Sequence, residues 1–328
     1  MKILGIGNAL LDVLIRLKSD DTLSGIGIKK GAMDLIDRQQ MIAIQQAQAS
    51  LERSEAPGGS VCNTIRALAR LGADVGYIGK IGSDAAGSFY EKSVLEAGVT
   101  PFFVRTEGIS GCSTVLISPD GERTMASFLG PAATLTANDI TDDTLSRYDC
   151  VYIEGYLISN EALFLPILQR IHKLGVKIAL DLSNFNIVNG FKDLLSEVIP
   201  RYVHILFSNE SEAEAYTGLD ARNAIREIAG QVAISVVTIG KEGALAGSGN
   251  EVIAVPATGG KAIDTTGAGD NFAAGFLYGQ SAGASLEQSA RIGALLAGHV
   301  IEVVGPQIPP ERWEQIKIDA RDILTPSR

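Results

Sequence analysis

Short apolar runs recur along the chain and alternate with longer stretches in which apolar residues return every three or four positions. The short runs are typical of buried strands, and the longer stretches are typical of amphipathic helices. The alternation is most regular in the second half, where the strand patterns are "CVYIEG", "VKIALDL", "VHILFSN" and "ISVVTIG". Strands that alternate with helices favour a mostly parallel central sheet covered on both faces, which is a three-layer α/β/α fold.

Two β-rich segments interrupt this alternation. They are residues 13–36 and residues 99–127, and the second contains the strand patterns "FFVRT", "STVLIS" and "RTMASF". We expect the two segments to pair with each other as a small separate sheet. The remaining ranges, 1–12, 37–98 and 128–328, would then form the α/β core.

Composition and charge narrow the class of protein. The chain has 328 residues, 46% of them hydrophobic, which suits a globular protein with one large domain or a large and a small one. The formal net charge is −10 and no block of Lys and Arg occurs, which argues against nucleic acid or an anionic membrane as partner. A phosphate ligand stays compatible, because backbone N–H groups and Mg²⁺ bind phosphate in acidic proteins too.

The sequence carries no recognisable targeting signal, which favours a cytoplasmic protein. No run of about 18 apolar residues predicts a transmembrane helix. Asn8 and Asp12 interrupt the apolar start, which favours a buried first strand over a signal peptide. Cys62, Cys112 and Cys150 lack metal-ligand spacing and fit a reducing compartment.

Several well-known catalytic motifs are absent. Each Gly-Lys pair is followed by a residue other than Ser or Thr, so no Walker-type P-loop exists. The dinucleotide-binding pattern G-x-G-x-x-G fails after the first strand, where Leu10 takes the third glycine position. There is no G-x-S-x-G motif, and three histidines far apart in the sequence give little support to a histidine-based triad.

The stretch "DTTGAGDNFAAGF" carries the most distinctive chemistry. Gly267 and Gly269 permit a sharp turn and leave no Cβ in the way of a ligand. The helix expected after them has free N–H groups and a positive dipole end, where an anion can bind. Asp270 would place a carboxylate beside that space, and we expect the dipole to keep it ionised. The alternative is an ordinary helix end whose aspartate only complements the dipole.

Three further segments are expected at the carboxyl ends of strands, where open parallel sheets bind ligands. Gly58 and Gly59 precede a helix with Asn63 in its first turns. Asn209 and Glu212 lie three residues apart, a spacing that suits either a Mg²⁺–water shell or a capping box. The segment "VTIGKEGA" ends a strand where a nucleotide could lie.

Together these segments resemble the ribokinase-like, PfkB-type family of sugar and nucleoside kinases. The resemblance covers nearly the whole chain in the family's order: "GNALLDV", "GGSVCNTIRALARLG", "GKIGSDAAG", "SNESEAE", "VTIGKEGA" and "DTTGAGDNFAAGF". The last segment matches the family's most specific signature. Ile65 stands where many members have Ala, which would alter packing near the substrate but leaves Asn63 in place.

The resemblance implies roles for individual residues. Asp270 would be the catalytic base, and the N–H groups of Gly267, Ala268, Gly269 and Asp270 would bind the transferred phosphoryl group. The expected substrate-binding residues are Asp12, Gly58, Gly59 and Asn63. The expected nucleotide-binding residues are Asn209, Thr238, Gly240 and Gly243.

The resemblance also implies ATP and Mg²⁺ as cofactors, with Glu212 holding Mg²⁺ through water and Asp264 beside a monovalent cation such as K⁺. The β-rich segments would form a lid over the substrate. The implied activity is transfer of the γ-phosphoryl group of ATP to a hydroxyl, a primary CH₂OH, of a sugar or nucleoside.

Alternatives stay open at this point. "GNALLD" and "FSNESEAEAYTG" favour an adenosine-kinase-like substrate, whereas "LARLG" and "SDAAG" are shared with sugar kinases. A non-catalytic nucleotide- or sugar-binding protein could keep the same fold, and a nucleotide-dependent dehydrogenase is a more distant possibility. The expected assembly is a monomer or a homodimer, because exposed lid strands could pair across a dimer.

Overall fold

The computed structural model describes residues 1–31 and 33–325. Its larger sheet has the strand order β14-β13-β12-β11-β10-β9-β1-β5-β6. These strands are β1 (Ile3–Ile6), β5 (Val75–Gly82), β6 (Thr100–Thr106), β9 (Cys150–Glu154), β10 (Lys177–Asp181), β11 (Ile205–Asn209), β12 (Ile234–Thr238), β13 (Ala244–Ser248) and β14 (Glu251–Val255). All neighbours from β12 to β6 are parallel, and β13 and β14 form an antiparallel edge. The expected mostly parallel central sheet is therefore confirmed.

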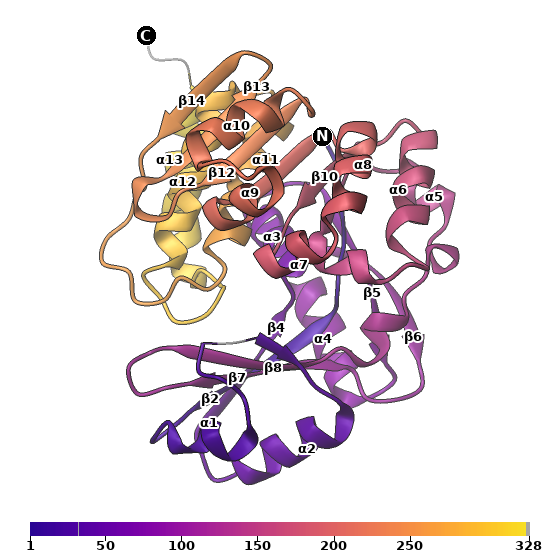
Figure 1. Cartoon of the computed structure of the whole chain (residues 1–328), viewed down its shortest axis with the longest axis vertical. Coiled ribbons are helices and arrows are strands. Elements are labelled where there is room, and N and C mark those ends of the chain that lie inside the picture. Colours follow the sequence, from indigo (N-terminus) through magenta and orange to yellow (C-terminus); the bar gives the residue numbers. More distant parts are fainter. Residues whose placement is uncertain (32, 326–328) are drawn as a thin grey trace.

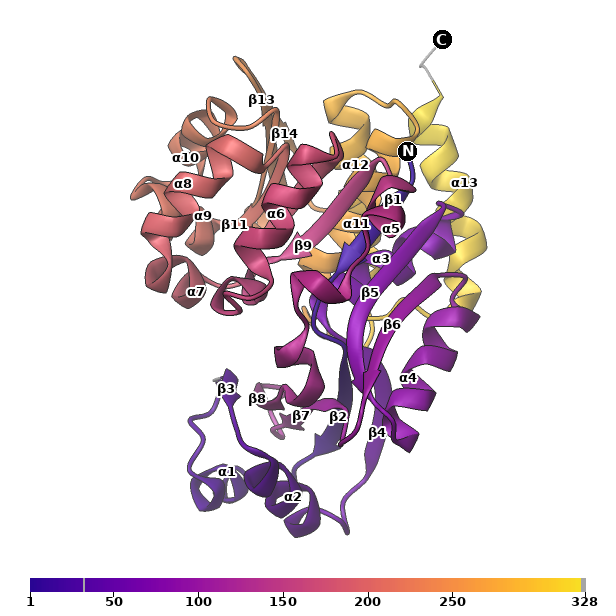
Figure 2. The same cartoon turned by 90° about the vertical axis from the view of Figure 1, so that its right-hand side faces the viewer.

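Helices cover both faces of this sheet, and Figure 2 shows the layers side by side. One face packs against α3 (Ser60–Leu71), α4 (Ala85–Glu96), α11 (Ala268–Ser281), α12 (Leu286–Val300) and α13 (Trp313–Leu324). The other face packs against α5 (Asp142–Ser146), α6 (Phe164–Lys173), α7 (Phe185–Gly190), α8 (Lys192–Tyr202), α9 (Glu210–Thr217) and α10 (Ala221–Ala229). Each face has its own apolar core, as expected for strands buried on both sides.

Short 3₁₀ helices connect some of these elements. They are η1 (Gly130–Thr134), η2 (Ala137–Asp139), η3 (Gly155–Ser159), η4 (Gly240–Glu242) and η5 (Pro310–Arg312). The helix α6 contains Pro166 near its start, where the missing N–H would have had no partner inside the helix.

The smaller sheet has the strand order β3-β8-β7-β2-β4. Its strands are β2 (Leu10–Arg16), β3 (Met33–Leu35), β4 (Arg53–Gly58), β7 (Gly111–Ile117) and β8 (Arg123–Phe128). Figure 1 shows it below the large sheet, with α1 (Asp21–Ile26) and α2 (Arg38–Ala47) beneath it. Leu23 of α1 and Met41 of α2 belong to the apolar cluster on that outer face, so only the opposite face is turned toward the core.

The small sheet differs in two places from the ranges expected for the lid. Strand β6 lies within 99–127, yet it pairs with β5 in the large sheet, because β5, α4 and β6 form one β-α-β unit. Strand β4 and helix α2 lie within 37–98, yet both belong with the small sheet. Strand β4 is an edge strand whose first residues are polar and exposed, so its sequence carries no apolar alternation.

The first strand is buried, as expected, and lies between β9 and β5 in the large sheet. Within residues 1–31 and 33–325, no helix is both long and apolar enough to cross a membrane. Cys62, Cys112 and Cys150 are buried and form no disulfide.

Candidate active site

Asp270 lies in the first turn of α11, where Gly267 adopts a left-handed conformation (φ 75°) that starts the helix. Its carboxylate accepts a hydrogen bond from Ser60 Oγ (2.7 Å) and another from Asn63 Nδ2 (2.9 Å). Both donors belong to α3, and no side chain caps α11. Asp270 is therefore held by a neighbouring helix and does not act as an ordinary helix cap.

Burial raises the pKa of Asp270, while the hydrogen bonds from Ser60 and Asn63 act in the opposite direction. The dipole of α11 was expected to keep this group ionised, but the loss of water around the carboxyl is the larger effect. A raised pKa makes the carboxylate a better proton acceptor than an exposed aspartate.

The turn in front of Asp270 offers amide donors to an anion. A Cβ on Gly269 would meet no atom within 4 Å, so the space over the turn is open. In the described part of the chain, the N–H groups of Gly267, Gly269 and Asp270 have no acceptor. The N–H of Ala268, expected as a fourth donor, is bonded instead to the carbonyl of Thr265 at 3.1 Å.

Asp12 on β2 stands close to this turn. Burial raises its pKa to about 7, the Arg123 cation counteracts the rise, and the Asp270 charge adds to it. A Cβ on Gly58 would lie 2.2 Å from the Asp12 carboxyl, so only glycine leaves room for that side chain. Gly59 has φ 91°, and a Cβ there would lie 2.3 Å from the carbonyl oxygen of Asn8. The two glycines therefore let β4 and α3 approach the site closely.

Glu154, at the end of β9, is a residue that sequence reasoning missed. It is fully buried and accepts hydrogen bonds from the backbone and side chain of Asn8 (2.8 and 2.7 Å) and from Val61 N–H (3.2 Å). It thereby ties the strand that leads into the lid to the first turn of α3. Burial raises its pKa to about 7 despite these bonds. Its position at the carboxyl end of a strand was the available signal.

Asn209 and Glu212 form a reciprocal capping box at the start of α9, with bonds of 2.7–3.0 Å. The capping interpretation therefore holds for this pair. Burial and the nearby Asp181 carboxylate raise the pKa of Glu212 to about 8. Asp181, which sequence reasoning also missed, ends β10, and burial together with Asp270 raises its pKa to about 7.

The Asp181 and Glu212 carboxylates are suited to a divalent cation, because a nearby positive charge would relieve the cost of ionising both groups. Among the described residues, however, no three His, Cys, Asp or Glu side chains gather as a metal site. A cation here would need phosphate oxygens or water to complete its shell.

Thr238, Gly240 and Gly243 lie where β12 ends, and Thr238 is paired with Asn209 in the sheet. Gly243 has φ 105°, and a Cβ there would lie 2.0 Å from the carbonyl oxygen of Val255. A Cβ on Gly240 would meet nothing within 4 Å. The expected nucleotide-binding residues thus lie together at one edge of the sheet, with open space beside Gly240.

Asp264 is engaged on both carboxylate oxygens. Thr266 donates to one oxygen through its N–H (3.0 Å) and its hydroxyl (2.9 Å), and Gly305 N–H donates to the other (2.6 Å). Arg123, at the start of β8, forms an ion pair with the same carboxylate, and both side chains are 10% exposed. This contact ties the small sheet to the loop before α11, and sequence reasoning missed it because the partners lie far apart in the chain.

A cavity of about 340 Å³, partly open to solvent, lies beyond the carboxyl ends of β1 and β9. Asn8, Leu129 and Tyr156 are among its lining residues. The Tyr156 hydroxyl donates to the carbonyl of Ser183 at 3.2 Å. The aromatic ring, the leucine and the amide give the cavity both an apolar wall and a polar one.

Asp270 thus stands beside a turn with free amide N–H groups, in a three-layer α/β/α fold that carries a second, smaller sheet. The sequence matches the pfkB family carbohydrate kinase pattern over residues 23–313. The chain belongs to this family. Its members are phosphotransferases that act on hydroxyl groups and use ATP, and this chain is a kinase of that kind.

Individual relatives include both sugar and nucleoside kinases. The adenosine kinase of Saccharomyces cerevisiae is 29% identical over 94% of this chain and 96% of its own length. The structure of a probable sugar kinase from Rhizobium etli has a TM-score of 0.89 and 31% identity, covering 97% of this chain and 98% of its own. The structure of adenosine kinase from Sinorhizobium meliloti has a TM-score of 0.87 and 32% identity, covering 98% of each chain. These relatives support the adenosine-kinase-like branch.

Proposed function

We propose that the chain transfers the γ-phosphoryl group of ATP to a primary hydroxyl of a nucleoside, with Asp270 accepting the hydroxyl proton. One observation carries this proposal: α3 holds the Asp270 carboxylate beside the open space over Gly269. A hydroxyl bound there would lie between the carboxylate and the free amides of the turn. That is the geometry an in-line transfer needs.

Each residue of this turn has its own role in the proposed reaction. Asp270 orients the hydroxyl and takes its proton late, because phosphoryl transfer passes through a loose transition state. The amides of Gly267, Gly269 and Asp270 and the positive end of α11 stabilise the charge on the transferred group. Ala268 contributes by closing the turn through its bond to Thr265.

Mg²⁺ neutralises phosphate charge in such kinases. We assign Asp181 and Glu212 to hold its water shell, because both are carboxyls with raised pKa values at the carboxyl ends of strands or just beyond them. Asn209, Thr238, Gly240 and Gly243 would contact the nucleotide along the same edge.

The lid supports a nucleoside over a free sugar. Directly paired residues share one face of a sheet, and Asp12 and Arg123 mark the face turned toward the core. A row of apolar side chains crosses the same face: Leu14, Val115, Met125 and Met33. The row beside it consists of three polar residues, Asp12, Ser113 and Ser127, followed by the apolar Leu35 at the edge of the sheet.

A nucleoside suits this face of the small sheet, because it has a polar ribose and a largely apolar base. Its ribose hydroxyls would meet Asp12, Asn63 and the backbone at Gly58 and Gly59, and its base would lie against the apolar row and Tyr156. A free sugar would leave the apolar row without a partner. The small sheet acts in this proposal as a lid, and the rest of the chain as the kinase core. A monovalent cation at Asp264 would have to share or replace the Arg123 guanidinium.

The test is an ADP-release assay with adenosine, other nucleosides, ribose, fructose and related sugar acids. Nucleosides should exceed free sugars in kcat/KM by about 10²-fold or more, since burying roughly 100–150 Å² of apolar surface contributes about 3 kcal/mol. Tyr156→Ala should reduce this preference. Equal or greater kcat/KM for ribose or fructose would assign the site to sugars, and no ADP release with any acceptor would indicate a binding protein.

A further inference from the structure

A second pocket, of about 80 Å³ and partly open to solvent, lies against the side of α3. Asn63, Arg66 and Arg70 line it from one face of that helix, and Gln307 and Trp313 line it from the C-terminal part of the chain. Asp270, Asp12 and the two glycines before α3 are not among its lining residues. The pocket therefore lies beside the site proposed for the acceptor and shares only Asn63 with the residues assigned to it.

The pocket is positively charged. Neither Arg66 nor Arg70 forms an ion pair with a carboxylate in the described residues, and none of the residues that line the pocket is acidic. Arg66 makes one long bond of 3.5 Å from Nη1 to the carbonyl of Pro57. Two guanidinium groups without counter-charges favour an anionic ligand.

Unsatisfied polar atoms point to the same place. Four buried side-chain polar atoms in the described chain lack a hydrogen-bond partner, and two of them, Asn63 Oδ1 and Arg66 Nε, belong to residues that line this pocket. Buried polar atoms in native proteins are almost always paired. Arg66 thus has donor capacity that the chain itself does not use.

The remaining wall is apolar. It consists of Ala67, Pro306, Ile308, Pro310 and the ring of Trp313, whose indole N–H is already bonded to the carbonyl of Ile308 (3.2 Å). We propose that this pocket binds a small molecule with one oxyanion, a carboxylate or a phosphate, on a compact apolar body. The oxyanion contacts Arg66 and Arg70, and the body packs against the apolar wall.

The pocket is linked to the catalytic turn. Asn271 lines it and donates from Nδ2 to the carbonyls of Gly267 (2.9 Å) and Pro306 (3.1 Å). A Cβ on Gly267 would lie 2.6 Å from Pro306 Cβ, so the turn and the pocket wall touch. Asn63 reaches from the pocket to Asp270. Ligand binding therefore stabilises the arrangement of the turn and changes the rate of phosphoryl transfer.

The test uses a property of the sequence: Trp313 is the single tryptophan of the chain. Tryptophan fluorescence of the full chain, saturated with ATP to occupy the nucleotide site, is titrated with phenyl phosphate, benzoate and inorganic phosphate. We expect a saturable change with at least one of the two aromatic anions. Response to phenyl phosphate alone assigns a phosphate ligand, and response to benzoate alone assigns a carboxylate ligand.

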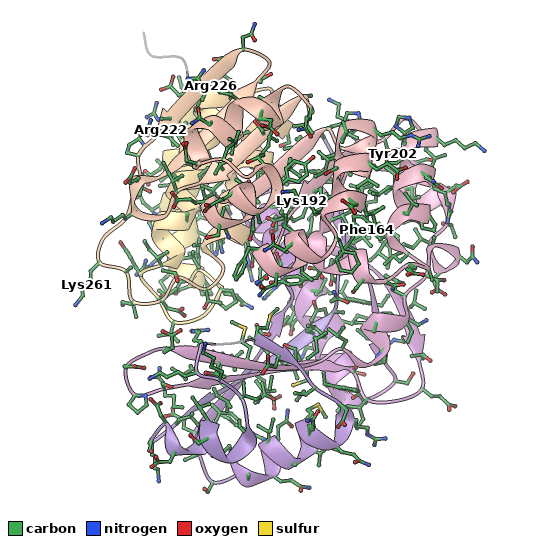
Figure 3. All side chains as sticks on the ribbon, viewed as in Figure 1. Phe164, Lys192, Tyr202, Arg222, Arg226 and Lys261 are labelled. Carbon is green, nitrogen blue, oxygen red and sulfur yellow. The ribbon has the colours of Figure 1, made fainter. Side chains whose placement is uncertain are left out.

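Arg70→Ala is the decisive variant, because Arg70 is exposed and its loss should not affect folding. It should weaken binding by about tenfold or more, since a charge-assisted hydrogen bond is lost. Arg222→Ala is the matched control: Arg222 lies on α10, at the end of the molecule away from the small sheet (Figure 3), and its removal should leave binding unchanged.

Two results would overturn the proposal. One is the absence of any saturable signal with all three anions up to about 10 mM, which corresponds to less than ~3 kcal/mol of binding. The other is binding that Arg70→Ala leaves at wild-type strength. Neither depends on which hydroxyl the enzyme phosphorylates, so this test is independent of the substrate assay.

Discussion

At the scale of single residues, the site depends on side chains that reach between elements. The Asp270 carboxylate is oriented by Ser60 and Asn63, which stand 210 and 207 positions earlier in the chain. Glu154 in turn holds the first turn of α3, through Val61, and the strand end at Asn8. The Asp270 carboxylate is thus positioned by α3, and α3 is positioned by β9.

Asp270→Ala should lower kcat by about 10²–10⁴-fold, the usual contribution of a general base, while the Kd for ATP changes little. The measurements are steady-state ADP release and ATP binding by calorimetry. Asp322→Ala, at an exposed position of α13, is the matched control and should behave as the wild type. A near-normal kcat in the Asp270 variant would show that another group accepts the proton.

The sequence predicted Asp270 and the glycine turns because these are local: neighbouring residues carry the whole pattern. It did not predict Glu154, Asp181 or Arg123. Each of these is a common residue type whose meaning comes only from what the fold brings beside it. The Arg123–Asp264 contact joins positions 141 residues apart, and no local spacing encodes such a pair.

At the scale of elements, the burial pattern of a strand explains whether the sequence could predict its place in a sheet. Inner strands of the large sheet such as β1 and β9 are buried on both faces and read as apolar runs, so their positions and their parallel order follow from the alternation with helices. Strand β4 is a polar edge strand, and β6 stands next in sequence to the small sheet but completes a unit with β5 and α4. Sequence proximity alone cannot assign a strand to a sheet.

The ion pair between Arg123 of β8 and Asp264, in the loop before α11, should restrain the small sheet relative to the large one. Arg123→Gln leaves the Asp264 carboxylate without its cation at a nearly buried position, which costs about 3–5 kcal/mol when one partner of such a pair is removed. We expect faster amide hydrogen exchange in β7 and β8 and a higher KM for the acceptor.

Arg147→Gln is the control for this variant. Arg147 pairs with Asp143 on the surface, where the side chains are 60% and 74% exposed, so its loss should cost about 0.5 kcal/mol or less. Equal effects of the two substitutions on amide hydrogen exchange in β7 and β8 would mean that the Arg123 contact does not restrain the small sheet.

The edges of the small sheet favour a monomer. Helices α1 and α2 bury one face of that sheet, so a second chain would have to pair with an edge strand, β3 or β4. Strand β3 is only three residues long and β4 begins with polar, exposed residues, and such edges disfavour pairing. Analytical ultracentrifugation should give the mass of a single chain at micromolar concentration. A stable dimer would require another surface.

At the scale of the whole molecule, the large sheet gathers several carboxyl groups with raised pKa values at one edge. Burial raises the pKa of Glu154 to about 7 and that of Glu212 to about 8, from 4.5 in each case. Between about pH 4.5 and those values the folded state keeps protons that the unfolded state releases. Stability therefore falls as pH rises through this window.

The melting temperature without ligands should accordingly be lower at pH 8 than at pH 5.5. In Glu154→Gln, stability relative to the wild type should increase steadily over the same range, because the substituted side chain no longer titrates. The partly exposed His204 and His299, whose pKa values burial lowers, act in the opposite direction. A wild-type melting temperature that rises from pH 5.5 to 8 would contradict this account.

The distance between Ser60 and Asp270 along the chain also has a consequence in time. A ribosome adds about 5–20 residues per second, so the 210 residues between them take about 10–40 s to synthesise. By the end of that interval α3 and the strands of both sheets have been synthesised, and the carboxylate that Ser60 and Asn63 hold comes only after them. A nascent chain can therefore assemble much of its core before Asp270 is synthesised, so the contacts of Asp270 with Ser60 and Asn63 are among the later ones to form.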